Sequence, residues 1–574
     1  MGDRLINEGV KWMLLTLWLA VNLVAWLVSY FKYANSDEYF YIRHLMGASL
    51  AVARASATCL NLNSMMILLP VCRNIISFLR GSCEANRYYR RNLRRQLDKN
   101  ITFHKFVAYL IVFFTIIHIV SHCFNSQNLY NSSVGERGPL ASFLTSMRTE
   151  TGGFLNPIQA ITKTSTGLGL VEKVLQLLPG WTGAVLTLIL VVMLSSATEF
   201  IRRSYFETFW FTHHLFVLYF GMILAHGAQG IVSSQSNVAI HDPKACFESF
   251  NQWSPTGNGC RNPTFVNGSA GSWKWLLFPM VCYVFERIFR LYRAWQTVVI
   301  TKVVQHPSSV IEIQMKKRGF KMLPGQYIFL LCPSISRVQW HPFTLTSAPE
   351  EEQLSVHIRV VGDWTSKLRE KLGADQEGEQ SVAKLPSIAI DGPFGTASID
   401  IFEYQVGICI GAGIGVTPFA SILKSISNKV LSPDSDLKLK KVYFFWICRD
   451  TNAFEWFSEM LSSLESMLIE NGQRDFLEYH IYLTRGWSHR QAKNIYLQEE
   501  QEVDAITGLR QKTNYGRPKW NDIFNIIAQD NPGVNAGVFF CGPKSLSTVL
   551  HKCSNRHSSL KADGCRFFYN KENF

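Results

Sequence analysis

Long apolar runs occur only in the first half of this 574-residue chain, and they constrain its fold more than any other feature. A helix needs about 20 apolar residues to cross the hydrocarbon layer of a bilayer. Runs that approach this length occupy residues 12–31, 45–69, 103–124, 177–198, 210–228 and 275–289. The second half has the composition of a soluble protein, and the chain is too long for one domain. We therefore predict six membrane-spanning helices followed by a soluble part.

The loops between these segments predict their orientation. Short loops that face the cytosol carry an excess of Lys and Arg. The basic residues of the loops after the second and fourth segments are Arg80, Arg87, Arg90, Arg91, Arg94, Arg95, Lys99, Arg202 and Arg203. Glycosylation acceptor patterns begin at Asn131 and Asn267, in loops of the opposite side. We therefore expect both termini in the cytosol. Much of the net charge of +14 belongs to the cytosolic loops, so it does not indicate nucleic-acid binding.

Two of the predicted helices each contain a pair of histidines, His104 with His118 and His213 with His226. Ionisable residues inside a membrane are costly and usually functional. On an ideal helix the first pair is about 21 Å apart and about 40° out of phase, so one helix offers a ligand to each of two stacked haems. The second pair is about 140° out of phase, which requires a kink or π-bulge. Hydrogen bonds to neighbouring helices, or a proton path, are the alternative.

We predict that His104 and His213 ligate an inner haem and that His118 and His226 ligate an outer haem. A haem with two axial histidines has no open position, so an acceptor must take its electron without binding iron. This suits one-electron transfer to a small acceptor such as O₂. Arg54 is a cation inside an apolar run, and it needs a partner such as a haem propionate or a developing superoxide anion.

The second half of the chain begins with β-rich sequence, with predicted strands at residues 298–304, 309–315 and 327–331. Three polar and aromatic motifs follow, His341-Pro-Phe-Thr344, His357-Ile-Arg359 and Gly362-Asp-Trp-Thr365. A β-barrel lined by an aromatic ring, hydroxyls and an arginine suits a flavin and its pyrophosphate. Such residues also furnish many barrels that bind no flavin.

A glycine-rich segment, Gly411-Ala-Gly413-Ile-Gly415-Val-Thr-Pro418, follows a buried-strand pattern at 406–410. Such a turn lets backbone N–H groups approach a pyrophosphate at the start of a helix, and Pro418 suits the first helical turn. The spacing differs from G-x-G-x-x-G, and a structural turn is the alternative. Strands predicted at 443–447 and 537–540 end in Cys448-Arg-Asp450 and Cys541-Gly-Pro543, and ligands bind at such strand ends in open sheets.

Together these segments resemble the catalytic subunit of the phagocyte-type NADPH oxidases, which are membrane flavocytochromes b, and the second half resembles the ferredoxin–NADP reductase fold. The resemblance is carried by Arg94-Arg-Gln-Leu-Asp98, His341 to Pro349, Asp391-Gly-Pro-Phe-Gly-Thr-Ala-Ser398, Gly411 to Ala420, and Asn570-Lys-Glu-Asn-Phe574. It implies a six-helix transmembrane bis-haem bundle at residues 1–295, a β-barrel FAD-binding domain at 296–400 and an α/β NADPH-binding domain at 401–574.

The resemblance also implies roles for individual residues. The FAD-binding positions are His341, Pro342, Phe343, Thr344, Arg359, Thr365 and Phe574, the last being the terminal aromatic that covers the flavin ring. The NADPH-binding positions are Gly411, Gly413, Pro418, Arg449, Arg517, Cys541, Gly542 and Pro543. Both arginines occupy positions expected at the 2′-phosphate, which a planar guanidinium recognises well, although a surface salt bridge is the alternative for either. Arg54 and His122 match residues associated with oxygen reduction, and Cys246 and Cys260 match a disulfide in a cap over the outer haem.

The activity implied is transfer of electrons from cytosolic NADPH through FAD and two b-type haems to O₂ on the opposite side, producing superoxide. The implied partners are a small transmembrane subunit, cytosolic organiser and activator proteins and the GTPase Rac, at the plasma membrane. Departures from the family pattern at Thr484-Arg-Gly-Trp-Ser488 and Ile426-Ser-Asn-Lys429 leave the dependence on activators open. A ferric or cupric reductase, and a proton channel or transporter with a vestigial reductase half, are the alternatives; Arg54 and the cysteine pair favour O₂ over the first.

Overall fold

The computed structural model describes residues 4–82, 90–146, 174–228, 230, 232–254, 260–373, 385–395, 397–430, 437–449, 455–484, 503–504 and 506–572. The chain divides into two compact units. The helical unit comprises Leu14–Cys72 and Asn100–Phe285. The sheet unit comprises Met1–Met13, Arg73–Lys99 and Glu286–Phe574.

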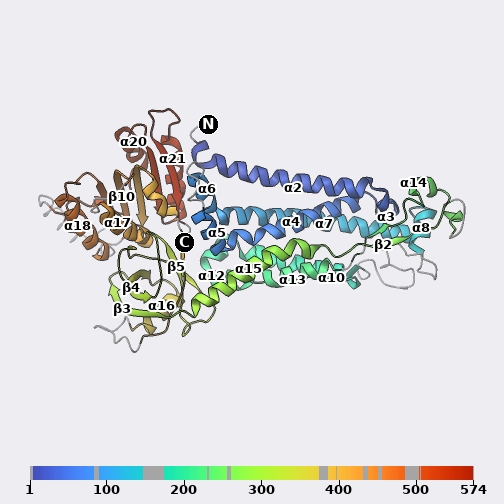
Figure 1. Cartoon of the computed structure of the whole chain (residues 1–574), viewed down its shortest axis with the longest axis horizontal. Helices are drawn as coiled ribbons and strands as arrows, with labels where there is room; N and C mark the ends of the chain where they lie inside the picture. The colour runs from blue at the N-terminus through green and yellow to red at the C-terminus, as the bar shows by residue number, and fades with distance from the viewer. Residues whose placement is uncertain are drawn as a thin grey trace. The chain divides into compact units, whose positions relative to one another are not determined.

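The helical unit contains the long apolar helices (Figure 1). Among the described residues, the helices long and apolar enough to cross a membrane are Leu5–Asn35, Ser49–Val71, Asn100–Ser133, Leu178–Ser196 and Phe206–His226. They contain α2 (Val10–Asn35), α4 (Ser49–Ile67), α7 (Asn100–Ser133), α10 (Leu178–Ser196), α12 (Phe206–His213) and α13 (Phe216–His226). The predicted segment at 275–289 is also helical, as α15 (Ser272–Ala294), but it carries more charge than these spans, including Lys274, Glu286 and Arg287.

The fifth predicted helix is broken. It consists of α12, which ends at His213, and α13, which begins at Phe216. At the break the backbone N–H of His214 is shared between the carbonyls of Trp210 and Phe211, at 3.3 and 3.2 Å. Such a tightened turn changes the angle about the helix axis between His213 and His226 from that of a regular helix. The kink that their spacing requires is therefore present.

A small cap of loops and short elements belongs to the helical unit. Its two strands, β1 (Ser233–Gln235) and β2 (Phe265–Asn267), pair antiparallel, and the short helix α14 spans Pro243–Cys246. Cys246 and Cys260 form a disulfide bond with a Cα–Cα distance of 5.6 Å, as predicted. The cap packs on α3 (Phe40–Met46) through a cluster that includes Tyr41 and Phe265, and His241 there bonds both the Tyr41 hydroxyl and the Arg261 carbonyl.

The sheet unit begins, in the soluble part, with two three-stranded antiparallel sheets. One has the order β3 (Val298–His306), β4 (Val310–Lys317), β7 (Leu354–Arg359), and the other has the order β6 (His341–Thr344), β5 (Tyr327–Leu331), β8 (Ala389–Phe394). Both contribute to one apolar core, which includes Ile313, Val356, Ile328 and Ile390. A bridge between Leu345 and Val356 joins the two sheets. The strands predicted at 298–304, 309–315 and 327–331 are confirmed.

A six-stranded parallel sheet follows, in the order β12-β11-β10-β9-β13-β14. Figure 1 labels its strand β10. The strands are β9 (Val406–Ala412), β10 (Lys441–Cys448), β11 (Leu477–Leu483), β12 (Asn514–Tyr515), β13 (Asn535–Cys541) and β14 (Arg566–Lys571). Separate apolar clusters on its two faces pack against α17 (Thr417–Val430) with α18 (Glu455–Glu470), and α20 (Trp520–Asp530) with α21 (Lys544–His557). The sheet is therefore doubly wound, and its strand order reverses between β9 and β13, the position where such sheets bind ligands.

A buried ion cluster ties the basic segment after the second span into the sheet unit. This segment contains α5 (Arg73–Ser82) and α6 (Arg90–Leu97). Arg80 pairs with Asp98 and with Asp400, both at 3.0 Å, and Arg94 pairs with the other oxygen of Asp400 at 3.1 Å. Burial makes such pairs sensitive to the loss of any one partner. The segment that predicted orientation by its charge is thus also part of the folded sheet unit.

Candidate functional site

The four predicted histidines meet in two facing pairs in the helical unit. The ring centroids of His104 and His213 lie 6.3 Å apart, at an interplanar angle of 65°. Those of His118 and His226 lie 6.2 Å apart, at 64°. Both pairings are the ones that the sequence predicted, and each joins α7 to one part of the broken helix.

The Nδ1 atoms of three of these rings are hydrogen-bonded. His104 Nδ1 lies 2.9 Å from the Ile67 carbonyl, and His118 Nδ1 lies 3.1 Å from the Ala53 carbonyl, so each Nδ1–H donates. His226 Nδ1 lies 3.1 Å from the Thr182 hydroxyl, which itself donates to Leu178 and therefore accepts. These bonds fix the tautomer that leaves Nε2 available to a metal.

The spacing of the pairs fits a haem iron held between two imidazoles. A metal–imidazole bond of about 2 Å, with about 1 Å more to each ring centre, places the centroids about 6 Å apart. His214 does not share this geometry, because its ring contacts those of Trp210 and Phe216, with centroids 4.1 and 6.0 Å away.

Arg54 and His122 lie beside the second pair. Arg54 follows Ala53, whose carbonyl accepts from His118, and the rings of His118 and His122 are 4.5 Å apart. The Arg54 guanidinium donates to the Tyr33 hydroxyl at 2.9 Å and lies 5.0 Å from that ring. Both Arg54 and His122 are exposed in the described chain. Sequence reasoning did not identify Tyr33, for which no motif gave a signal.

The predicted glycosylation positions differ in their surroundings. Asn131 lies near the end of α7, where its Oδ1 accepts from Gln127 at 2.8 Å. Asn267 ends β2 and is exposed, and its Oδ1 accepts from the Ser233 hydroxyl at 2.8 Å. Both side chains are at least partly accessible, as a modified asparagine must be.

The His341-Pro-Phe-Thr344 motif forms β6 of the sheet unit. The His341 ring stacks on Trp364, with centroids 4.1 Å apart, and Phe343 lies 6.1 Å from the same indole. His341 Nε2 and Trp364 Nε1 are buried without a hydrogen-bond partner. Burial lowers the pKa of His341 to about 4, so its imidazole is neutral. Buried polar atoms left open in an aromatic stack fit the polar edge of a flavin, since such atoms are normally satisfied.

Two more of the residues that are predicted to bind the flavin lie near the ends of secondary-structure elements, one at the end of β7 and one at the start of α16. Arg359 ends β7 and is exposed. Thr365 lies in the first turn of α16 (Asp363–Lys371), where its hydroxyl accepts from the N–H groups of Val361 and Gly362, both at 3.1 Å. Pro342 is exposed and Thr344 is buried on β6. Phe574 lies outside the described residues. Trp364, which the sequence placed in a motif but not in the site, is the residue that organises it.

A separate cavity of about 660 Å³ in this unit contains none of the predicted residues. Its basic lining residues are Lys316, Lys317, Arg318 and Lys321. It opens beside β4, and the aromatic stack of His341 and Trp364 is not part of its wall.

The glycine-rich turn lies at the switch point of the parallel sheet. Gly411 is in register with Cys541 on the adjacent β13. Gly413 has a φ of +59°, and a Cβ on Gly415 would lie 2.4 Å from the Cys541 carbonyl oxygen. Pro418 is the second residue of α17, in its first turn as predicted. The turn therefore needs glycine both for its backbone conformation and for close approach to β13; Gly415 was in the motif but not among the predicted site residues.

The remaining predicted nucleotide residues lie along the same carboxyl edge. Gly542 directly follows β13, with a φ of +156°, and precedes Pro543. Cys541 is buried, and burial raises the pKa of its thiol. Arg449 follows β10 and Arg517 follows β12, and both are exposed. These strands are two positions apart in the sheet, about 10 Å, a span that two long side chains can bridge.

Replacing Gly415 by alanine tests the close approach of this turn. The new Cβ would overlap the Cys541 carbonyl oxygen, so the turn must move from the edge of the sheet. We expect KM for NADPH to rise at least about tenfold, because a displacement of about 1 Å in a positioning element is costly. Steady-state NADPH oxidation measures this. Gly81→Ala is the control, since nothing lies within 4 Å of its added Cβ; equal effects of the two changes would contradict the prediction.

Glu572 anchors the end of the chain inside the sheet unit. Its backbone N–H donates to Phe540 at 2.9 Å, and its Oε1 accepts from the N–H of Ser398 at 2.7 Å and from the Ser398 hydroxyl. Burial raises its pKa to about 7, although the Ser398 bonds lower it. The folded state therefore binds this proton more tightly than the unfolded chain.

The raised pKa of Glu572 predicts a pH-dependent stability. The contribution of this protonation to the free energy of unfolding is complete below about pH 4.5, and it is lost as the pH rises through about 7. When the pH rises from 6 to 8, the free energy of unfolding should fall by about 1 kcal/mol less in Glu572→Gln than in the wild type. Thermal unfolding of both proteins at the two pH values measures this difference. Parallel pH dependence in the two proteins would show that Glu572 does not titrate in this range.

Comparison with known proteins agrees with this geometry. Residues 65–224 match the family described as ferric reductase like transmembrane component, residues 295–398 the FAD-binding domain, and residues 404–555 the ferric reductase NAD binding domain. NADPH oxidase 1 of Mus musculus is 48% identical over 100% of this chain and 95% of that protein. NADPH oxidase 3 of Homo sapiens is 48% identical over 100% of both. A superoxide-generating NADPH oxidase heavy chain of Dictyostelium discoideum is 40% identical over 99% of this chain and 98% of that protein.

A membrane helical part joined to FAD-binding and NAD-binding domains defines a transmembrane oxidoreductase that draws electrons from a nicotinamide through a flavin. Its 48% identity over the full length of two NADPH oxidases is decisive. The chain belongs to the NADPH oxidase family. The predicted family, fold class and enzyme class are confirmed, and the three matched ranges follow the order of the predicted domains.

Proposed function

We propose that this protein oxidises NADPH in the cytosol and reduces O₂ to superoxide on the opposite side of the membrane. One NADPH supplies two electrons, so two O₂ become two superoxide anions while NADP⁺ and one proton remain in the cytosol. FAD supplies the conversion from hydride transfer to single electrons, and haem carries those electrons singly. Protons left behind make turnover electrogenic.

The facing histidine pairs are the observation that carries the proposal. His104 with His213, and His118 with His226, would hold the inner and outer haems. The bonds from Nδ1 to Ile67, Ala53 and Thr182 orient three of these rings. An iron held by both imidazoles of a pair would have no open position, which favours electron transfer to an acceptor that does not ligate the metal.

The soluble part would position the two cofactors that supply electrons. The aromatic stack of His341, Phe343 and Trp364 would hold the flavin, with Arg359 and the first turn of α16 at its pyrophosphate. The Gly411–Gly415 turn would hold the NADPH pyrophosphate. Arg449 and Arg517 would bind the 2′-phosphate, and Cys541, Gly542 and Pro543 would border the nicotinamide. Phe574 is proposed to cover the flavin ring.

Arg54 and His122 would form the oxygen site beside the outer haem. The Arg54 guanidinium, held by Tyr33, supplies positive charge where a superoxide anion develops. His122 lies against the outer pair and would hold or donate a proton at its ring nitrogens. The disulfide-bonded cap would cover this site and keep larger acceptors away.

We further propose a plasma-membrane location with both termini in the cytosol, and glycans on Asn131 and Asn267. A small transmembrane subunit, cytosolic organiser and activator proteins and Rac are the proposed partners. The basic residues of α5, α6 and the loop at Arg202 and Arg203 support the orientation, because Lys and Arg accumulate on the cytosolic side.

A ferric or cupric reductase is the second candidate, because the matched membrane and nucleotide domains are described as ferric reductase-like. Purified protein, reconstituted with FAD, separates the two. Its reduced-minus-oxidised spectrum should show two low-spin haems per chain that NADPH reduces. When a reporter that superoxide reduces is added under air, superoxide dismutase should suppress the reduction of that reporter. Electrons that reach ferric chelate but not O₂, in protein supplied with its activators, would establish the metalloreductase. Absence of haem would overturn both and favour a channel or transporter.

A further inference from the structure

Three metal-binding side chains meet on one face of the first antiparallel sheet of the soluble part. His306 ends β3, Glu312 lies on β4 and His357 on β7. In the register of this sheet Glu312 lies directly opposite His357, and its partner on β3 is Val304, two residues before His306. Side chains two residues apart on a strand share a face, as do directly opposed pairs. The pleat of three strands therefore brings the two imidazoles and the carboxylate together.

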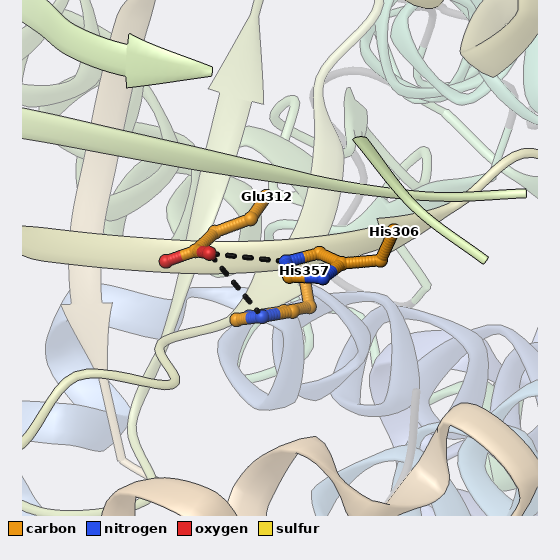
Figure 2. Close-up of side chains that lie close together, drawn as sticks. All are labelled: His306, Glu312 and His357. Atoms are coloured by element: carbon orange, nitrogen blue, oxygen red, sulfur yellow. Dashed lines mark hydrogen bonds and ion pairs between the residues drawn. The ribbon is translucent and has the colours of Figure 1, made fainter. Parts of the chain in front are cut away.

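The side chains converge on one carboxylate oxygen (Figure 2). Glu312 Oε2 lies 3.1 Å from His306 Nε2 and 3.7 Å from His357 Nε2. One ligand atom from each residue lies within 4.8 Å of the others. Around a tetrahedral ion with bonds of about 2.0–2.2 Å, neighbouring ligand atoms are about 3.3 Å apart. The two separations from Glu312 Oε2, 3.1 and 3.7 Å, bracket that value, so an ion fits with small side-chain rotations.

The outer atoms of two of these residues are tied by further hydrogen bonds. His357 Nδ1 lies 2.8 Å from the Thr346 hydroxyl, which also contacts the Ser355 hydroxyl at 2.8 Å. Gln314 donates from Nε2 to Glu312 Oε1 at 2.9 Å. Bonds of this kind orient metal ligands and are part of most metal sites, because they fix ring and carboxylate rotations.

An ordinary histidine–carboxylate pair in the same unit differs in composition. His480 Nε2 lies 3.0 Å from Glu478, whose other oxygen pairs with Lys441 at 2.9 Å. That carboxylate is shared by one imidazole and one ammonium, and an ammonium cannot ligate a metal. At Glu312 Oε2 both neighbours are imidazoles, and their rings stack at 5.2 Å and 24°. Among the described residues, the His306, Glu312 and His357 group is the one whose ligand atoms approach closely enough to share an ion.

We propose that His306, Glu312 and His357 bind one divalent transition-metal ion of the zinc class, with water completing a tetrahedral site. Two imidazoles and one carboxylate are a ligand set that Zn²⁺ uses in proteins. Because His306 Nε2 donates to Glu312 Oε2, binding an ion at Nε2 would move that proton to Nδ1 or release it to solvent. The ion would link β3, β4 and β7, and β7 ends at Arg359. This inference is independent of the proposed electron route.

Zinc content of the purified full-length protein tests the site. Chelator-treated protein is equilibrated with Zn²⁺ alone, and bound zinc is measured separately from haem iron. We expect one zinc per chain in the wild type and at least about 100-fold weaker binding in Glu312→Gln and in His306→Gln. Thr346→Val should weaken binding about tenfold, since it removes only an orienting bond. Cobalt should give the intense visible bands of a four-coordinate ion.

His480→Gln is the matched control, because it removes a histidine bonded to a glutamate on β11. Its zinc affinity should equal that of the wild type. Thermal unfolding confirms that each variant folds, and the position of His306 at the last residue of β3 makes that variant the safest substitution. Absence of bound zinc in the wild type, or equal affinity in Glu312→Gln and the wild type, overturns the proposal. Zinc retained by a His306→Gln, His357→Gln double variant also overturns it, because that ion binds elsewhere.

Discussion

Replacement of His118 by leucine is expected to lower the haem content from two per chain to one and to abolish superoxide production. Leucine has a similar volume but offers no ligand, so the outer haem loses one axial bond while the inner pair of His104 and His213 is unchanged. NADPH should still reduce the remaining haem, because the step that is lost lies beyond it. A pyridine haemochrome assay and superoxide-dismutase-sensitive reduction of a reporter measure both effects.

His214→Leu is the control for this change. His214 neighbours a proposed ligand, but its ring packs against those of Trp210 and Phe216. The variant should keep two haems and most of its activity. If His118→Leu retained two haems, or if His214→Leu lost one, the pairing of His118 with His226 would be wrong as a haem site.

Replacement of Asp400 by asparagine should destabilise the sheet unit by about 3–5 kcal/mol. Asp400 accepts from Arg80 and Arg94 through its two oxygens, and all three side chains are buried. Loss of the shared negative charge leaves two adjacent guanidinium groups in a site of low dielectric constant. The change should release the segment 73–99 from the sheet unit. Chemical denaturation measures the stability, and limited proteolysis measures the exposure of this segment.

A nearby surface ion pair provides the comparison. Glu403 lies in the same short helix, Ala397–Glu403, and pairs with the exposed Lys438 at 3.2 Å. Glu403→Gln should cost less than about 1 kcal/mol, because solvent screens such pairs. Similar costs for the two substitutions would mean that the Asp400 cluster is not a buried network.

Local patterns were sufficient to predict much of the fold and of the site. The apolar runs predicted the long helices, because a membrane span depends on the length and composition of one continuous segment. The Gly411 turn was recognised because three glycines within five residues leave few backbone alternatives. The paired histidines stood out because ionisable residues are rare in such segments. Each signal is contained within a short stretch of chain.

Other features required the tertiary structure. The spacing of His213 and His226 demanded a kink, but only the structure placed it between His213 and Phe216. Tyr33 packs against Arg54, and Trp364 packs against His341. No sequence motif indicates these contacts. Strands β11, β12 and β14 were not predicted, since a strand in a sheet is stabilised mainly by its packing against neighbouring strands.

The amino-acid sequence by itself determined which segments suit a membrane, which histidines lie within those segments and where a glycine-rich turn begins. These properties depend on residue type and local spacing. The tertiary structure alone decided the partners: Asp400 with Arg80 and Arg94, Ser398 with Glu572, and His306 and His357 with Glu312. These contacts depend on strand register and on the burial of charge, which long-range packing establishes and local sequence does not encode.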